Sequence, residues 1–155
     1  RLARANCARK CASPLPTRRI RALSCPDSPA PIEERVILAD TSVWVQHLRF
    51  GDSRFADALG SELICVHAFV VGELACGNLR NRSEILELLA NLTSLPSATD
   101  AEILAFIENR ALMGRGIGLI DVHLLASAAI AGIPIWTHDK RLAAVAAELH
   151  LGYEE

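Results

Sequence analysis

Four carboxylates could do chemistry together, because each stands alone beside or within an apolar stretch. Asp40 and Asp139 each follow a short apolar run. Glu73 is the only charge between residues 68 and 79, and Asp121 precedes a stretch without Asp, Glu, Lys or Arg. If they gather, each pair of charges 4 Å apart costs roughly 4 kcal/mol at an effective dielectric of about 20, so a cation must compensate. Oxygen-only ligation favours Mg²⁺ or Mn²⁺ over Zn²⁺, and such an ion can activate water for attack on a phosphate ester.

Each acid taken alone also has a purely structural interpretation. Asp40 and Asp139 are suited to cap a following helix, since an aspartate oxygen accepts from the first free backbone N–H groups. Asp121 is favourable in a first helical turn because of the helix dipole. Glu73 is suited to a structural salt bridge with an arginine. The chemical interpretation therefore depends on whether the four converge.

The predicted strands place three of these acids at one edge of a sheet. Val36–Ala39 is a short uncharged apolar run, typical of a strand buried on both faces of a parallel sheet. Leu63–Val66 and 134–136 are further candidate strands, with helical patterns between them. Alternating strands and helices predict an α/β fold whose parallel strands end at the same edge, where ligands bind.

The sequence predicts a helix that carries Glu73 and a second helix that begins with a capping box. The segment Ala68–Leu79 is apolar almost all round, so we expect a buried helix, in which an unpaired Glu73 carboxylate would be costly. Thr99 and Glu102 match a capping box that opens another helix.

Charge is distributed unevenly along the 155 residues, and this indicates a domain boundary. Residues 1–35 hold eight basic and three acidic residues, a formal charge of +5, which leaves −7 for residues 36–155 of the total of −2. Five of the seven prolines lie in the first 31 residues, without apolar periodicity. We expect residues 1–35 to be a disordered basic leader, either an expression remnant or an upstream extension, and residues 36–155 to be one domain.

Composition is that of an ordinary globular chain, with 51% hydrophobic and 22% charged residues. The longest stretch without Asp, Glu, Lys or Arg, residues 122–138, is too short and too interrupted by Gly132 and Pro134 for a membrane span. The five cysteines show no disulfide or zinc spacing. We expect a cytoplasmic protein with no membrane association.

The acid-bearing stretches, taken in order, resemble a known family. They read VILADTSVW (36–44), FVVGELACGNLR (69–80), GRGIGLIDVHLLASA (114–128) and WTHDKRL (136–142). This series is similar to the four motifs of the PIN-domain ribonucleases, specifically the VapC-type toxins of bacterial toxin–antitoxin pairs. The resemblance covers residues 36 to about 153.

The resemblance implies a three-layer α/β/α sandwich around a parallel sheet of four or five strands. It implies Mg²⁺- or Mn²⁺-dependent endonucleolytic cleavage of RNA, with Asp40, Glu73, Asp121 and Asp139 as the metal-binding, catalytic acids. Thr41 and Ser42 would orient Asp40, and Thr137 would support the site by hydrogen bonding. The implied partners are transfer or ribosomal RNA, a second copy of the chain, and a cognate antitoxin whose tail covers the site.

A core charge of −7 does not favour bulk attraction of RNA, so RNA must be held locally. The candidate RNA contacts are basic residues near the motifs: Arg80, Arg82, Arg115, Lys140 and Arg141.

Two other classes of protein remain alternatives. A phosphoacceptor receiver domain also places acids and a lysine around Mg²⁺, with Asp40 and Lys140 as possible counterparts, but its paired acid and mid-sheet phosphoacceptor are not visible. A catalytically inactive PIN-fold interaction module would not need acids at all four positions.

Overall fold

The computed structural model describes residues 36–154, in which short strands alternate with helices as the sequence predicts. The elements are, in order, β1 (Ile37–Ala39), α1 (Thr41–Phe50), α2 (Ser53–Gly60), β2 (Ile64–His67), α3 (Ala68–Cys76), α4 (Arg82–Asn91), β3 (Ser94–Leu95), α5 (Asp100–Asn109), α6 (Leu119–Ala131), β4 (Ile135–Trp136) and α7 (Lys140–Glu148). The expected leader lies outside the described residues, so the boundary at residue 36 stays a prediction.

The strands of this region form one parallel sheet in the order β3-β2-β1-β4. Leu38 of β1 pairs with Cys65 of β2 on one side and with Ile135 of β4 on the other. Every residue of β1 and β2 is buried, which explains why these strands read as continuous apolar runs rather than alternating ones. The predicted parallel sheet is confirmed.

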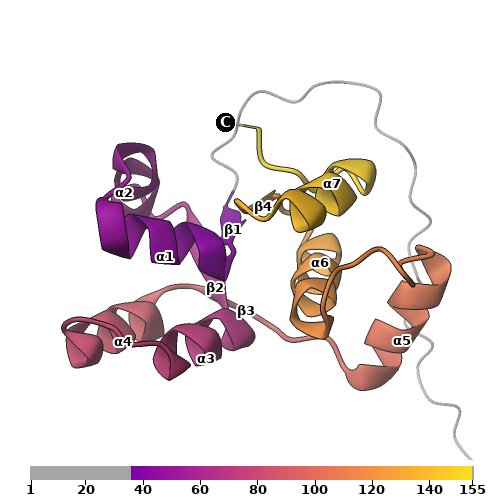
Figure 1. Cartoon of the computed structure of the whole chain (residues 1–155), viewed down its shortest axis with the longest axis horizontal. Helices are drawn as coiled ribbons and strands as arrows, with labels where there is room; N and C mark the ends of the chain where they lie inside the picture. The colour runs from indigo at the N-terminus through magenta and orange to yellow at the C-terminus, as the bar shows by residue number, and fades with distance from the viewer. Residues whose placement is uncertain (1–35, 155) are drawn as a thin grey trace, which may run out of the picture. The chain divides into compact units, whose positions relative to one another are not determined.

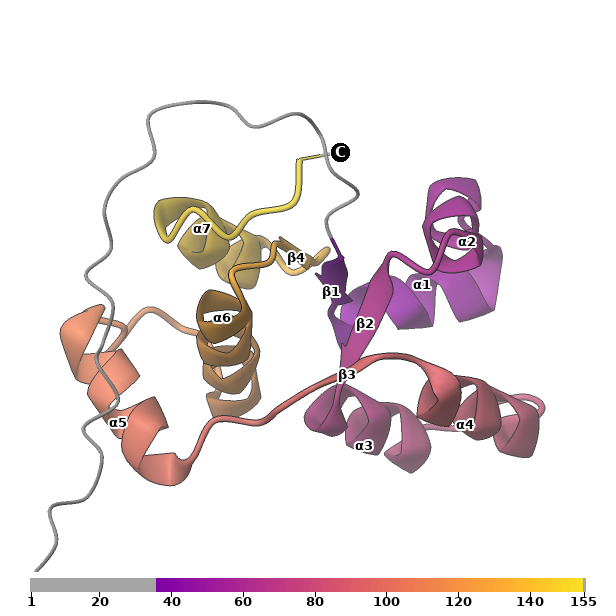
Figure 2. The ribbon, with the colours of Figure 1, turned by 180° about the vertical axis from the view of Figure 1, so that it is seen from behind.

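Helices cover the sheet on both sides. Figures 1 and 2 show α1 to α4 on one side of the strands and α5 to α7 on the other. The largest fully buried side chains come from several of these elements, among them Trp44 of α1, Leu74 of α3, Leu124 of α6 and Leu142 of α7. This confirms the predicted α/β/α layering, with one apolar core around the strands.

Helix α6 is the most deeply buried helix of the described region. Its residues from Val122 to Ala128 are all buried, and it packs beside β3 and β4. Gly132 ends it with a positive φ of 69°, a conformation that favours glycine. Between residues 36 and 154, no helix combines the length and apolar character that crossing a membrane requires.

The strand order determines where a ligand can bind. From β1 the chain proceeds to β2 and β3 on one side, whereas β4 is added on the other side of β1. Loops leaving the carboxyl ends of β1 and β4 therefore run in opposite directions, and such a reversal opens a crevice in an open α/β sheet. Asp40 follows β1 there, and the segment Thr137–Asp139 follows β4.

The capping box at α5 is confirmed and supports a prediction about stability. Thr99 Oγ1 accepts a hydrogen bond from the Glu102 N–H at 3.4 Å, and a Glu102 carboxylate oxygen accepts from the Thr99 N–H at 2.7 Å. We expect Thr99→Ala to lower the free energy of unfolding by about 1 kcal/mol, measured by urea denaturation. RNA cleavage should be unchanged because α5 carries none of the four acids; a stability equal to wild type would contradict the cap's role.

Candidate metal centre

Asp40 ties the ends of β1 and β4 together. It is buried, with 7% of its surface exposed, and it caps α1. Its Oδ2 accepts from the Ser42 backbone N–H at 3.3 Å, from Ser42 Oγ at 2.6 Å and from Thr137 Oγ1 at 2.8 Å. A carboxylate that receives several hydrogen bonds is held in one orientation, so Asp40 is the most firmly fixed of the four acids.

Two hydroxyls connect Asp40 to the loop after β4. Ser42 Oγ accepts from the His138 N–H at 3.0 Å, and Thr137 Oγ1 accepts from the Asp139 N–H at 3.0 Å. Each hydroxyl thus donates to Asp40 and accepts from the segment that carries Asp139. The structure places Ser42 and Thr137 where the sequence predicts supporting residues.

Thr41 has a different partner from the one expected. Its Oγ1 donates to Glu73 Oε2, not to Asp40, which its neighbour Ser42 already binds. The expectation that Thr41 orients Asp40 is therefore wrong. Thr41 instead links the first turn of α1 to α3, and so connects the Asp40 segment with Glu73.

Glu73 and its helix are more exposed than the sequence predicts. Helix α3 buries Val70 and Leu74, whereas Glu73 itself is exposed. The prediction of a buried helix is wrong, because small and apolar residues on its outer side face the surface. Among residues 36–154 the hydrogen bond to the Glu73 carboxylate comes from Thr41, which does not favour the arginine salt bridge considered above.

Asp121 lies within electrostatic reach of the other three acids. It lies in the first turn of α6, and its Oδ2 accepts from the Gly118 N–H at 2.7 Å. Burial raises the pKa of the Asp121 carboxyl, and the charges of Asp40, Asp139 and Glu73 raise it further, against the opposing effect of the Gly118 hydrogen bond. The three acids are therefore near enough to Asp121 for their charges to act on it.

Asp139 caps α7 and follows Thr137, the residue that binds Asp40. Its Oδ1 accepts from the backbone N–H groups of Arg141 at 2.7 Å and Leu142 at 3.1 Å. Asp40 and Asp139 thus do cap helices, as the structural interpretation predicts. Capping does not exclude a role in metal binding. Capping fixes the direction of each side chain at the sheet edge.

The carboxylates share a feature that suits a cation. In the described region each is held through one oxygen: Oδ2 of Asp40, Oε2 of Glu73, Oδ2 of Asp121 and Oδ1 of Asp139. The second oxygen of each receives no hydrogen bond from residues 36–154, and free carboxylate oxygens are what Mg²⁺ and Mn²⁺ bind. The donor set therefore fits a hard divalent ion.

Direct ligation by all four acids at once is not the arrangement observed. Within residues 36–154, no three His, Cys, Asp or Glu side chains are placed to hold one metal ion between them. Mg²⁺ commonly takes one or two protein carboxylates and completes its octahedron with water and phosphate oxygens. In that mode one or two of the four acids would bind the ion directly, and the others could accept hydrogen bonds from its waters.

The basic residues near the motifs are largely engaged with the chain itself. Arg82 donates to the Ala75 carbonyl at 2.9 Å, Arg115 pairs with Glu148 at 2.5 Å, and Arg141 Nη1 donates to the Gly116 carbonyl at 3.4 Å. Residues 114–118, which precede α6, are thereby fastened to α7. Lys140 begins α7 directly after Asp139.

A groove of about 490 Å³ adjoins Glu73 and Thr41. It lies between α1 and the segment from α3 to α4, and it is lined by apolar side chains together with two arginines, Arg49 and Arg80. Phe50, at the end of α1, borders it with 82% of its surface exposed. The sequence gives no local signal for this groove, because its walls come from separate helices.

Thr137 offers a test of the hydrogen bonds around Asp40. Removing its hydroxyl in Thr137→Val leaves Asp40 with Ser42 alone and frees the Asp139 N–H. Loss of such an orienting partner costs about 10-fold to 100-fold in metal affinity or activity. We expect a reduction in the RNA cleavage rate in this range, whereas Thr137→Ser should retain most of it; equal rates for both variants would contradict the role of the hydroxyl.

Comparison with known proteins agrees with this geometry. The family model of the PIN domain matches residues 37–148. Ribonuclease VapC32 of Mycobacterium tuberculosis, from strains CDC 1551 / Oshkosh and ATCC 25618 / H37Rv, is 46% identical over 114 residues, which are 73% of this chain and 92% of that protein. The crystal structure of PAE2754 from Pyrobaculum aerophilum shares the fold, with a TM-score of 0.51 and 16% identity over 72% of this chain and 80% of that one. The chain therefore belongs to the PIN-domain family and, within it, to the VapC-type ribonucleases.

Proposed function

We propose that Asp40, Glu73, Asp121 and Asp139 form the active site of this ribonuclease and bind Mg²⁺ or Mn²⁺. As a VapC-type PIN-domain protein, the chain is a metal-dependent endoribonuclease toxin. The assignment is supported by the repulsion that Asp40, Asp139 and Glu73 exert on Asp121, and by the one oxygen of each carboxylate that accepts no hydrogen bond from residues 36–154.

The metal ion and the acids have separate roles in the proposed site. A bound divalent ion would act as a Lewis acid on the phosphate and would lower the pKa of a bound water, which makes that water a better nucleophile at neutral pH. Asp40, fixed by Ser42 and Thr137, is the rigid ligand of the set. Glu73, on α3, and Asp139, which caps α7, would supply further negative charge to the ion. The positive charge of the ion, rather than that of a basic side chain, would then balance the negative charge of the acids.

RNA is the proposed substrate, with transfer or ribosomal RNA as the class of target. Lys140 and Arg141 begin α7 directly beside Asp139, and Arg115 and Arg141 border the loop before Asp121. Phosphates on either side of the scissile bond would therefore meet positive charge from α7, while Arg80 and Arg82 follow α3 on the Glu73 side. Because these contacts are few, we expect binding to depend on the shape of the RNA as well as on its charge.

The groove beside Glu73 is the proposed docking place of a cognate antitoxin. An apolar segment with an acidic residue would match the apolar walls and the two arginines, and it would cover the approach to Glu73. Exposed Phe50 would be buried by the same contact. Homodimer formation and a cytoplasmic location are proposed on family membership alone.

The test of the proposed function is RNA cleavage with a controlled metal supply. The purified full chain is incubated with total RNA in Mg²⁺, in Mn²⁺ or in EDTA, and the cut ends are mapped. We expect discrete internal cuts that leave 5′-phosphates with either metal, and a loss of at least about 100-fold in EDTA, since the ion contributes several kcal/mol to the transition state. Equal cleavage in EDTA would overturn the assignment.

The alternatives considered from the sequence are not favoured. Family membership places the chain among PIN-domain ribonucleases rather than receiver domains. An inactive interaction module is disfavoured because a chain with no need for metal would gain stability by losing one of the mutually repelling acids.

A further inference from the structure

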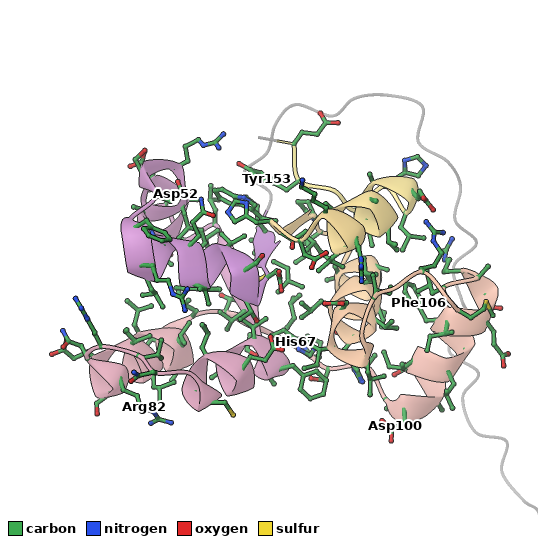
Figure 3. All side chains as sticks on the ribbon, in the orientation of Figure 1. Asp52, His67, Arg82, Asp100, Phe106 and Tyr153 are labelled. Carbon is green, nitrogen blue, oxygen red and sulfur yellow. The ribbon has the colours of Figure 1, made fainter. Side chains whose placement is uncertain are left out.

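A buried histidine lies at the same sheet edge as the acids, although nothing in the proposed chemistry uses it. His67 is the last residue of β2, is 0% exposed, and immediately precedes α3, the helix that carries Glu73. Figure 3 shows it where the start of α3 meets α6, the helix that carries Asp121. Burying an imidazole is costly unless both ring nitrogens find partners.

The two ring nitrogens of His67 bind two different helices. Nδ1 accepts from the Phe69 backbone N–H at 3.2 Å and so caps α3. Because a backbone N–H can only donate, Nδ1 carries a lone pair, and the proton of the neutral ring is on Nε2. Nε2 lies 3.2 Å from Ser127 Oγ, on α6, and therefore donates to it. Burial lowers the pKa of His67, with a smaller effect from His123, which keeps the ring in this neutral form.

Aromatic packing strengthens the same junction. The Phe69 ring meets the His123 ring edge-on at a centroid distance of 4.6 Å, and the rings of His67 and Phe69 are 5.2 Å apart. His123 lies two residues after Asp121 and is buried. The start of α3 and the first turns of α6 thus pack through His67, Phe69 and His123, with the Ser127 hydrogen bond as the directional contact.

We propose that His67 is a positioning residue: through its Nε2–Ser127 hydrogen bond it fixes α3 against α6, and thereby sets the spacing of Glu73 and Asp121 for the metal ion. This inference rests on the proposed metal site. A rigid junction is needed because Glu73 is exposed, and among residues 36–154 its carboxylate receives a hydrogen bond from the side chain of Thr41 alone. Removing a residue that orients a metal ligand, without itself binding the metal, commonly lowers metal affinity by about 10-fold to 100-fold.

Two substitutions separate the two functions of His67. The side-chain amide of Asn can replace Nδ1 but is too short to reach Ser127, so His67→Asn keeps the α3 cap and loses the contact with α6. The amide nitrogen of Gln lies near the place of Nε2, so His67→Gln keeps the donor to Ser127 and loses the cap. Ser127→Ala removes the same contact from the other side.

The experiment measures Mn²⁺ binding to the full chain by isothermal titration calorimetry, with thermal denaturation in EDTA as the measure of stability. We expect His67→Asn and Ser127→Ala to bind Mn²⁺ about tenfold more weakly, and the double variant to be no weaker than either single one. His67→Gln should bind within about twofold of wild type while melting at a lower temperature. The metal concentration for half-maximal cleavage should follow the same order, with the KM for RNA unchanged.

The outcomes distinguish this inference from the proposed function. Failure of wild type to bind Mn²⁺ would remove the metal site and the inference with it. If wild type binds but His67→Asn binds equally well, or His67→Gln is as weak as His67→Asn, the inference fails and the metal site stands. Should His67→Asn not fold, unchanged Mn²⁺ affinity in Ser127→Ala would overturn the inference by itself. Thr99→Ala, which weakens the cap of α5 but leaves the hydrogen bonds of His67 and Ser127 in place, is the matched control and should bind as wild type does.

Discussion

Asp40→Asn should reduce RNA cleavage at least about 100-fold while leaving the fold intact. The asparagine amide oxygen can accept the hydrogen bonds that Ser42 and Thr137 donate to Oδ2, so the cap of α1 and the connection between β1 and β4 persist. The variant loses one negative charge at a buried position. A bound cation there would be balanced by the charges of the acids. Loss of about 3 kcal/mol of metal-dependent stabilisation corresponds to that factor in rate.

The measurement is the single-turnover cleavage rate in saturating Mg²⁺ or Mn²⁺, with circular dichroism and the melting temperature in EDTA as evidence of folding. Thr99→Ala serves as the control for a modest loss of stability away from the site. Full activity in a folded Asp40→Asn variant would contradict the assignment of Asp40 as a ligand.

Asp121→Asn should abolish cleavage to a similar extent and at the same time stabilise the metal-free protein at neutral pH. The Asn oxygen keeps the hydrogen bond from the Gly118 N–H, whereas burial and repulsion by Asp40, Asp139 and Glu73 no longer act on a charge. We expect the melting temperature in EDTA to rise by about 3 °C, corresponding to about 0.5 kcal/mol, a small value because the half-buried carboxyl is partly screened by solvent.

The pH dependence of this difference has a definite sign. Because the pKa of Asp121 is raised in the folded state, the folded protein holds its proton more tightly than the unfolded chain does. The ionised carboxyl therefore destabilises the metal-free protein above the raised pKa. This penalty disappears as the pH falls through the raised pKa to the ordinary value for aspartate, so the advantage of the variant should shrink over that interval.

Added metal should reverse this order of stability. Added Mn²⁺ should raise the melting temperature of wild type more than that of Asp121→Asn, because a ligand that binds only the folded state stabilises it more when it binds more tightly. The measurement is a thermal melt at pH 7 and at successively lower pH, with EDTA or with Mn²⁺. A variant less stable than wild type in EDTA at pH 7 would contradict the repulsion at Asp121.

The pattern of apolar residues determines the elements of this protein and the place of three of its acids. The run Val36–Ala39 is free of charge because β1 is buried on both faces, and the position of Asp40 directly after it follows from that local pattern. The capping box at Thr99 is equally local, since its donors and acceptors lie within four residues. The sequence does not predict the two-residue strand β3, at Ser94–Leu95, because two residues are too few for any periodicity.

The tertiary structure alone decides which faces pack and which side chains meet. Apolar composition predicts that α3 is buried, but only Val70 and Leu74 of this helix are fully covered by neighbouring layers, and Glu73 is exposed. The strand order that opens the crevice between β1 and β4 depends on contacts between residues about a hundred positions apart. The same holds for the partners of Thr41 and His67, 32 and 60 residues away. Local periodicity carries no information on such pairs, because hydrogen bonds between distant segments form only once the whole core has fixed those segments in space.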